Sequence, residues 1–156
     1  PQHAYEAMEC LGGSGVMEDS PFPRLYREAP VNAIWEGSGN VQCLDVLRAM
    51  QKSPEVVGAL FAELDTARGA NAALDRAVAA LRAELRDPAD IEYRARGLVD
   101  RMALALQAAL LVRHAPAAVG DAFCASRLDG TGHRQYGTLP RGVDCAALIE
   151  RATPRA

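Results

Sequence analysis

The pattern with the clearest chemical potential is Val31–Gln42, where one carboxylate, Glu36, follows an apolar stretch that ends in Trp35. The apolar stretch predicts a partly buried wall. Gly37 and the Ser-Gly-Asn of residues 38–40 then form a turn and a typical helix start. A carboxylate at such a turn can act as a general base at the mouth of a pocket. The alternative is a solvated glutamate before an ordinary helix, and the segment alone leaves both interpretations open.

Helices are the elements expected to position this turn. Apolar residues recur at helical spacing through most of the chain, without the alternation typical of strands. Proline and glycine divide the pattern into segments. We therefore expect an all-α antiparallel bundle of six or seven helices. The candidate segments are approximately 2–11, 24–29, 39–53, 54–68, 72–85, 91–114, 116–128 and a short final helix after Asp144.

The composition agrees with a helical domain and argues against two classes of protein. The chain has 156 residues, enough for about one domain, and is 49% hydrophobic but only 5% aromatic. A net charge of −3 with mixed signs indicates neither a strongly basic nucleic-acid-binding protein nor a membrane-surface protein. The longest apolar run, at 102–112, is about half of the roughly 20 residues that a membrane span needs. We therefore expect no membrane partner.

The cysteines and histidines lack the spacing of a metal site. Cys10, Cys43, Cys124 and Cys145 lie far apart, and no histidine accompanies a cysteine pair at zinc-ligand spacing. We expect no metal, and we predict reduced, mostly buried thiols in a cytoplasmic protein. The chain begins without methionine and within a helical pattern at Gln2. This start indicates a C-terminal piece of a longer protein.

Three sequence blocks, taken in order, carry a family resemblance. They are Ala7–Gly15, Arg24–Ala29 and Ile34–Gln42. Together they resemble the C-terminal helical domain of the acyl-CoA dehydrogenases. The resemblance implies the all-α bundle of that domain with additional C-terminal helices. Residues 1–53 would be the end of the bundle and include Glu36, and residues 54–156 would be an extra helical region packed on it.

The resemblance implies an FAD-dependent oxidoreductase in which Glu36 removes the α-proton of an acyl-CoA thioester while a hydride passes to the flavin. Trp35 and Gly37 would lie in the substrate pocket, and the indole stands where many relatives have a tyrosine, so it would narrow that pocket. The residues implied to contact FAD are Leu11, Gly12, Gly13, Ser38 and Asn40. Because the family holds most of the flavin with other domains, this chain alone is expected to be inactive and not to retain FAD.

The later part of the chain resembles one branch of the family. Tyr93–Arg96, Leu111–His114 and Tyr136–Pro140 are similar to the extra helices of the bacterial alkylation-response proteins. The resemblance implies a flavin-containing homotetramer that binds duplex DNA. Residues 1–112 carry a net charge of −5 and residues 113–156 a net charge of +2. The candidate phosphate-binding residues are Arg113, Arg127, Arg134 and Arg141.

Two functions therefore stay open at the level of the sequence. The first is an acyl-CoA dehydrogenase that uses Glu36 as its base. The second is a DNA-binding protein of the alkylation response that retains a flavin site and has little dehydrogenase turnover.

Overall fold

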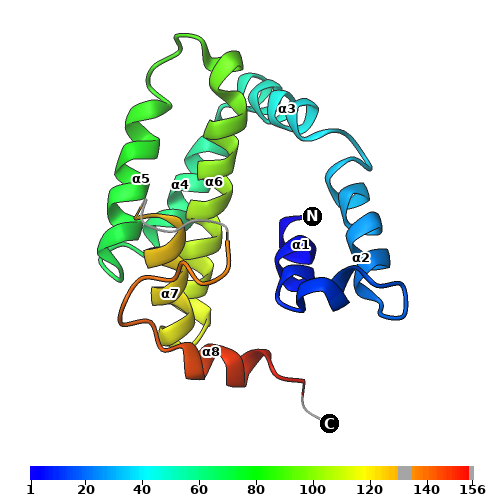
Figure 1. Ribbon diagram of the computed structural model, residues 1–156. Coiled ribbons are helices and arrows are strands. Elements are labelled where there is room, and N and C mark those ends of the chain that lie inside the picture. Colours follow the sequence, from blue (N-terminus) through cyan, green and yellow to red (C-terminus); the bar gives the residue numbers. More distant parts are fainter. Residues whose placement is uncertain (130–134, 155–156) are drawn as a thin grey trace.

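The computed structural model describes residues 1–129 and 135–154 (Figure 1). These ranges contain eight α-helices, two 3-10 helices and no strand. In chain order they are α1 (Gln2–Glu9), η1 (Gly12–Val16), α2 (Phe22–Glu28), η2 (Ala29–Ala33), α3 (Gly39–Lys52), α4 (Glu55–Asp65), α5 (Ala72–Glu84), α6 (Ile91–His114), α7 (Ala117–Arg127) and α8 (Cys145–Ala152). The prediction of an all-α fold is confirmed. The predicted number of six or seven helices is too low, since each of the eight candidate segments forms its own helix.

The bundle is organised around α6, which at 24 residues is about 36 Å long. It packs against α3, α4, α5 and α7. Its buried positions recur at helical spacing and are mostly small: Ala95, Leu98, Ala105, Ala108 and Ala109. Small residues also allow α7 to approach closely, since a Cβ on Gly120 would lie 3.1 Å from the Cα of Val112. The bundle core is therefore set by the sequence pattern of one long helix.

Helices α1 and α2 form a pair that stands beside this bundle (Figure 1). They pack against each other. Within residues 1–37 only Gly15 and Pro23 are buried. Large apolar side chains are instead exposed, including Tyr5, Leu11, Leu25, Tyr26, Val31, Ile34 and Trp35. This pair has almost no core of its own.

The loop before α8 also joins the α1–α2 pair to the rest of the chain. The backbone N–H of Tyr136 donates to a carboxylate oxygen of Glu6 at 2.8 Å, and its hydroxyl is hydrogen-bonded to Nδ1 of His3 at 2.5 Å. Burial raises the pKa of the Tyr136 phenol, so the hydroxyl keeps its proton well above neutral pH. These two bonds hold the loop on α1.

Helix ends follow the predicted signals in part. The break at Gly69 to Asn71 is confirmed, and the Asn71 side chain accepts from two backbone N–H groups at the start of α5. The first helix ends at Glu9 rather than near Leu11, because the chain tightens into the 3-10 turn η1. Asp90 precedes α6 as predicted, but its side chain makes no capping bond there.

Two carboxylates at helix ends connect α5 to its neighbours. Glu84, whose side chain is 20% exposed, accepts a hydrogen bond from Nε of Arg101 on α6 at 2.8 Å. Asp65 at the end of α4 accepts from Arg68 at 2.8 Å and from Arg82 on α5 at 2.7 Å. These two bonds lower the pKa of the Asp65 carboxyl.

The boundary proposed at residue 53 stays a prediction. α3 lies before it, and α3 packs directly against α4 and α6, which lie after it. No helix in the described part of the chain is long and apolar enough to cross a membrane.

Candidate functional site

Glu36 lies in a strained turn between η2 and α3. Its φ angle is +63°, a left-handed conformation that few residues other than glycine adopt, and Gly37 follows with a φ angle of +129°. The Gly37 N–H donates to the carbonyl of Ile34 at 3.1 Å, which closes the turn. The side-chain amide of Gln42, in the first turn of α3, donates to the carbonyl of Glu36 at 2.7 Å. The backbone of Glu36 is therefore fixed from both sides.

The Glu36 carboxylate itself points to no protein partner. Within the part of the chain that the structure describes it forms no hydrogen bond or ion pair, and the residue is exposed. Trp35 beside it is 62% exposed, and Val31 and Ile34 are exposed as well. The predicted partly buried wall is therefore wrong for this chain: the apolar stretch is an open surface, because the α1–α2 pair offers it no core.

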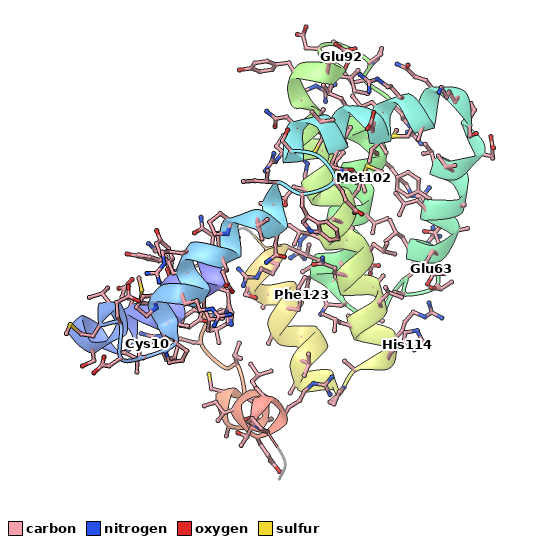
Figure 2. All side chains as sticks on the ribbon, turned by 90° about the vertical axis from the view of Figure 1, so that its right-hand side faces the viewer. Cys10, Glu63, Glu92, Met102, His114 and Phe123 are labelled. Carbon is pink, nitrogen blue, oxygen red and sulfur yellow. The ribbon has the colours of Figure 1, made fainter. Side chains whose placement is uncertain are left out.

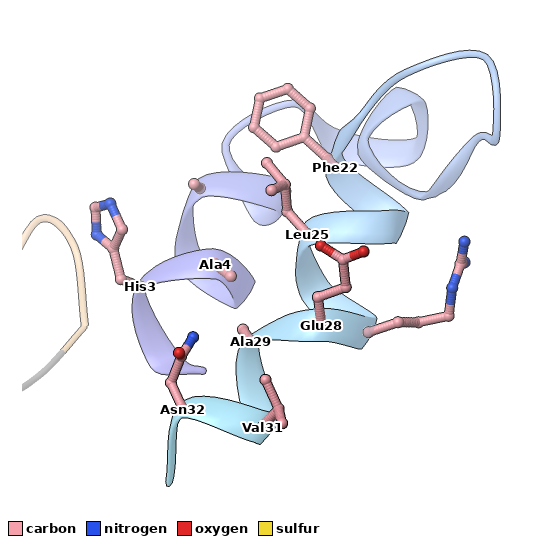
Figure 3. Close-up of a pocket in the computed structure, with 10 residues that line it drawn as sticks. His3, Ala4, Phe22, Leu25, Glu28, Ala29, Val31 and Asn32 are labelled. Carbon is pink, nitrogen blue, oxygen red and sulfur yellow. The ribbon is translucent and has the colours of Figure 1, made fainter. Parts of the chain in front are cut away.

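A cavity lies close to this surface, between α1 and α2 (Figure 3). Its volume is about 750 Å³, and its walls are mainly apolar. The lining residues are His3, Ala4, Ala7, Phe22, Leu25, Arg27, Glu28, Ala29, Val31 and Asn32. Neither Glu36 nor the predicted pocket residues Trp35 and Gly37 line it. The cavity and Glu36 are thus neighbours in the sequence, through Val31 and Asn32, but they do not form one enclosed site.

Two of the predicted cofactor residues begin α3. Ser38 is the N-cap residue, but its hydroxyl makes no capping bond with the helix. Asn40 accepts a hydrogen bond through Oδ1 from Nη1 of Arg96, on α6, at 3.1 Å. No local pattern identifies Arg96 as a partner of Asn40, because Arg96 lies 56 positions after Asn40 and only the crossing of α3 and α6 brings the two together.

The other predicted cofactor residues, Leu11, Gly12 and Gly13, follow α1 and are exposed. Gly12 has a φ angle of +58°, and no atom lies within 4 Å of where a Cβ would stand on Gly12 or Gly13. A ligand could therefore approach this backbone closely, as contact with a dinucleotide requires. These open glycines and a Ser38 hydroxyl that makes no capping bond are compatible with the FAD contacts that the family resemblance implies.

The four arginines predicted to bind nucleic acid lie on different elements. Arg113, near the end of α6, pairs with Glu63 at 2.6 Å. Arg127 ends α7, which is about 16 Å long, and Arg141 lies in the loop before α8. Arg134 lies outside the described residues. The structure therefore does not gather the three described arginines on one element.

Two of the four cysteines are buried and two are exposed. Cys43 and Cys124 are buried, and burial raises the pKa of the Cys124 thiol. Cys10 and Cys145 are exposed, so the prediction of mostly buried thiols is wrong for half of them. No group of metal-ligating side chains occurs among the residues that the structure describes.

Comparison with known proteins agrees with the blocks around this site. The family model for the C-terminal domain of acyl-CoA dehydrogenases matches residues 2–51. The putative acyl-CoA dehydrogenase AidB of Escherichia coli is 43% identical over 127 residues, which are 81% of this chain and 23% of AidB. Acyl-CoA dehydrogenase family member 11 of Caenorhabditis elegans is 48% identical over 52 residues, 33% of this chain and 8% of that protein.

A mitochondrial short-chain specific acyl-CoA dehydrogenase of Bos taurus is 39% identical over 49 residues, 31% of this chain and 12% of that enzyme. The chain thus spans less than a quarter of the length of each of these relatives. The similarity to AidB continues beyond the segment that matches the family model, which confirms the predicted branch. The chain belongs to the acyl-CoA dehydrogenase family, and within it to the branch of AidB.

Proposed function

We propose that this chain carries the base-bearing turn of an FAD-dependent acyl-CoA dehydrogenase. In this proposal Glu36 takes the proton from the carbon next to the thioester carbonyl, while a hydride leaves the adjacent carbon and a C=C bond forms. FAD, when bound, supplies the acceptor of that hydride. The chain contributes the base, the neighbouring apolar surface of Trp35, and FAD contacts at Leu11, Gly12, Gly13, Ser38 and Asn40.

The observation that carries this proposal is the left-handed backbone of Glu36. Such a conformation costs a residue with a side chain about 1–2 kcal/mol. Glycine would avoid this cost, and the glutamate side chain contributes no bond in the described chain that would offset it. Strain without structural benefit is typical of residues held for chemistry. The Gln42 bond to the Glu36 carbonyl fixes the direction in which the carboxylate leaves the backbone.

Proton abstraction needs more apolar surroundings than this chain supplies. The α-proton of a thioester is weakly acidic, so the base must be close to it and shielded from water. Glu36 is exposed here, and the adjacent Trp35 is 62% exposed. The indole and Ile34 would form one wall of the pocket, and the substrate and other parts of the protein would cover the carboxylate.

The proposal is tested in the full-length protein, meaning the protein that carries this chain at the length of its relatives. Acyl-CoA thioesters of different chain lengths are added anaerobically, and bleaching of the flavin absorbance is followed. Glu36→Gln should slow bleaching by about 10²–10⁴-fold, as expected for removal of a general base. Glu55→Gln, at the start of α4, is the matched control and should bleach normally. Absence of bleaching with every thioester would refute the proposal.

The cofactor part of the proposal has its own test. The chain of 156 residues by itself should bind FAD weakly or not at all, since only short segments of it are proposed to touch the dinucleotide. A tight, stoichiometric FAD complex of this chain alone would contradict that. The full-length protein is proposed to be a homotetramer, which its mass in solution would test.

Duplex DNA binding by the same protein is the second candidate. The net charge of +2 over residues 113–156 favours it. Neutralising a phosphate-binding arginine should reduce the slope of log affinity against log salt by about 0.9. Arg127→Gln and Arg141→Gln are the variants to measure, and Arg24→Gln on α2 is the control because that side chain pairs with Glu28. Unchanged binding in both variants would reject this site.

A further inference from the structure

Arg96 joins the long helix of the bundle to the start of α3. It lies on α6, beyond the segment that matches the family model, and its guanidinium donates to Oδ1 of Asn40 at 3.1 Å. Figure 2 shows α3 lying across the part of α6 near Glu92. Arg96 therefore lies outside the segment that matches the family model, yet it contacts Asn40, which the proposed function assigns to FAD.

The contact is shaped for a guanidinium. A Cβ on Gly39 would lie 2.5 Å from Cζ and 2.7 Å from Nη2 of Arg96, and real Cβ atoms essentially never come within 3.0 Å of another atom. The flat group therefore lies against the backbone of α3, and a side chain at position 39 would displace this exposed guanidinium. The hydrogen bond to Asn40 and the absence of a side chain at position 39 are separate features that locate the same group.

The bond also fixes which way the Asn40 amide faces. A guanidinium has only N–H donors, so the amide atom that faces Arg96 must be the oxygen. The two N–H donors of the Asn40 amide then point away from Arg96. The Asn40 amide, which could otherwise turn either its oxygen or its nitrogen outward, is thereby held with its N–H donors facing away from Arg96.

We propose that Arg96 is a positioning residue for FAD, and this inference rests on the proposed function. It holds Asn40 so that the amide N–H groups donate to hydrogen-bond acceptors of the dinucleotide, either phosphate oxygens or ring and carbonyl atoms. The region after residue 53 thus takes part in cofactor binding through α6.

FAD affinity of the full-length apoprotein is the quantity to measure, by fluorescence titration. Arg96→Met should weaken FAD binding roughly tenfold, the usual effect of losing one hydrogen bond to a charged group. Arg86→Met, at an exposed arginine between α5 and α6, is the control and should bind normally. In an Asn40→Ala background, Arg96→Met should cause no further loss, because Arg96 acts only through Asn40.

A second pair of variants separates positioning from general stability. Asn40→Asp keeps an oxygen for Arg96 but removes both N–H donors, so FAD binding should fall at least tenfold without a lower melting temperature. Gly39→Ala should weaken binding in the unaltered protein, where it displaces the guanidinium, and should be silent in Arg96→Met. These results would not follow if Arg96 only stabilised the helix crossing.

The outcomes distinguish this inference from the proposed function. FAD binding of normal affinity in Arg96→Met, or in Asn40→Asp, overturns the role of Arg96, while Glu36 still stands as the base if its own variant fails to bleach the flavin. A full-length protein that binds no FAD refutes the proposed function and the role of Arg96 together.

Discussion

Gly15 should be the least replaceable glycine of the turn after α1. A Cβ at this position would lie 3.0 Å from the carbonyl carbon and Cγ of Met8 and still closer to the carbonyl oxygen. Two of these three atoms are backbone, so the clash cannot be relieved by rotating a side chain. Overpacking of this kind costs about 1–3 kcal/mol. We expect Gly15→Ala to open the α1–η1 turn by that free energy.

Hydrogen exchange measured by mass spectrometry is the appropriate assay, because the α1–α2 pair has little core and can open without unfolding the bundle. Since about 1.4 kcal/mol corresponds to a tenfold change, amides of α1 and η1 should exchange roughly 5- to 150-fold faster in Gly15→Ala. Peptides from α6 should be unaffected and serve as the internal reference.

Gly13→Ala is the matched control. No atom lies within 4 Å of its Cβ position and its φ angle is not left-handed. Alanine there should leave exchange unchanged or slow it slightly, because it restricts the unfolded chain. Equal exchange in the Gly13→Ala and Gly15→Ala variants would refute the argument that Gly15 is required by its contact with the Met8 backbone.

Three further predictions concern the bundle and its ionisable groups. Leu98→Ala removes a side chain that is 0% exposed and should lower the free energy of unfolding by about 2–5 kcal/mol in urea titrations, whereas Leu25→Ala, at 51% exposure, should cost much less. Hydrogen bonds from Arg68 and Arg82 lower the folded-state pKa of the Asp65 carboxyl. The charged carboxylate therefore stabilises the fold above its unfolded-state pKa, and this stabilisation is lost as the pH falls through the folded-state pKa. Asp65→Asn should be less stable than the unaltered chain at pH 7 and equally stable in acid. Iodoacetamide should label Cys10 but not Cys124 in the folded chain, as peptide mapping would reveal, and labelling of both at equal rates would contradict the buried, protonated thiol.

The sequence predicts the helices well because helix formation depends on spacing within one segment. The recurring apolar residues of α6 and the Ser-Gly-Asn start of α3 are local signals, and the structure has both elements where the pattern indicates them. The 3-10 helix η2 is not indicated by the pattern, but the position of Glu36 between two helical segments follows from the same local signals. Its left-handed backbone does not, because a single turn sequence allows several backbone conformations.

Contacts between distant segments could not be predicted in the same way. The pairing of Asn40 with Arg96 depends on how α3 crosses α6, and the run Gly12-Gly13-Ser14-Gly15 does not tell which glycine is packed against backbone. The exposure of Trp35 could not be predicted either, since an apolar stretch predicts burial whether or not another part of the chain lies against it. Each of these features is decided by tertiary packing.

The two groups of proposed FAD contacts are held with different rigidity. Ser38 and Asn40 begin α3, whose residues Cys43 and Leu47 are buried in the bundle core one to two turns later. Their position is therefore fixed to α6, and Arg96 strengthens that connection. The segment Leu11–Gly13 depends instead on the sparsely buried α1–α2 pair.

It follows that any FAD site made by both groups requires a further constraint on α1. The bonds from Tyr136 to Glu6 and His3 supply one, but they link exposed groups. Contacts across the apolar surface of α1 and α2, once covered by substrate or by other parts of the protein, would supply the rest. Flavin binding should therefore order the Leu11–Gly13 segment while leaving the start of α3 unchanged, and hydrogen exchange with and without FAD in the full-length protein would measure both. Protection confined to α3 would show that the segment after α1 does not contact the cofactor.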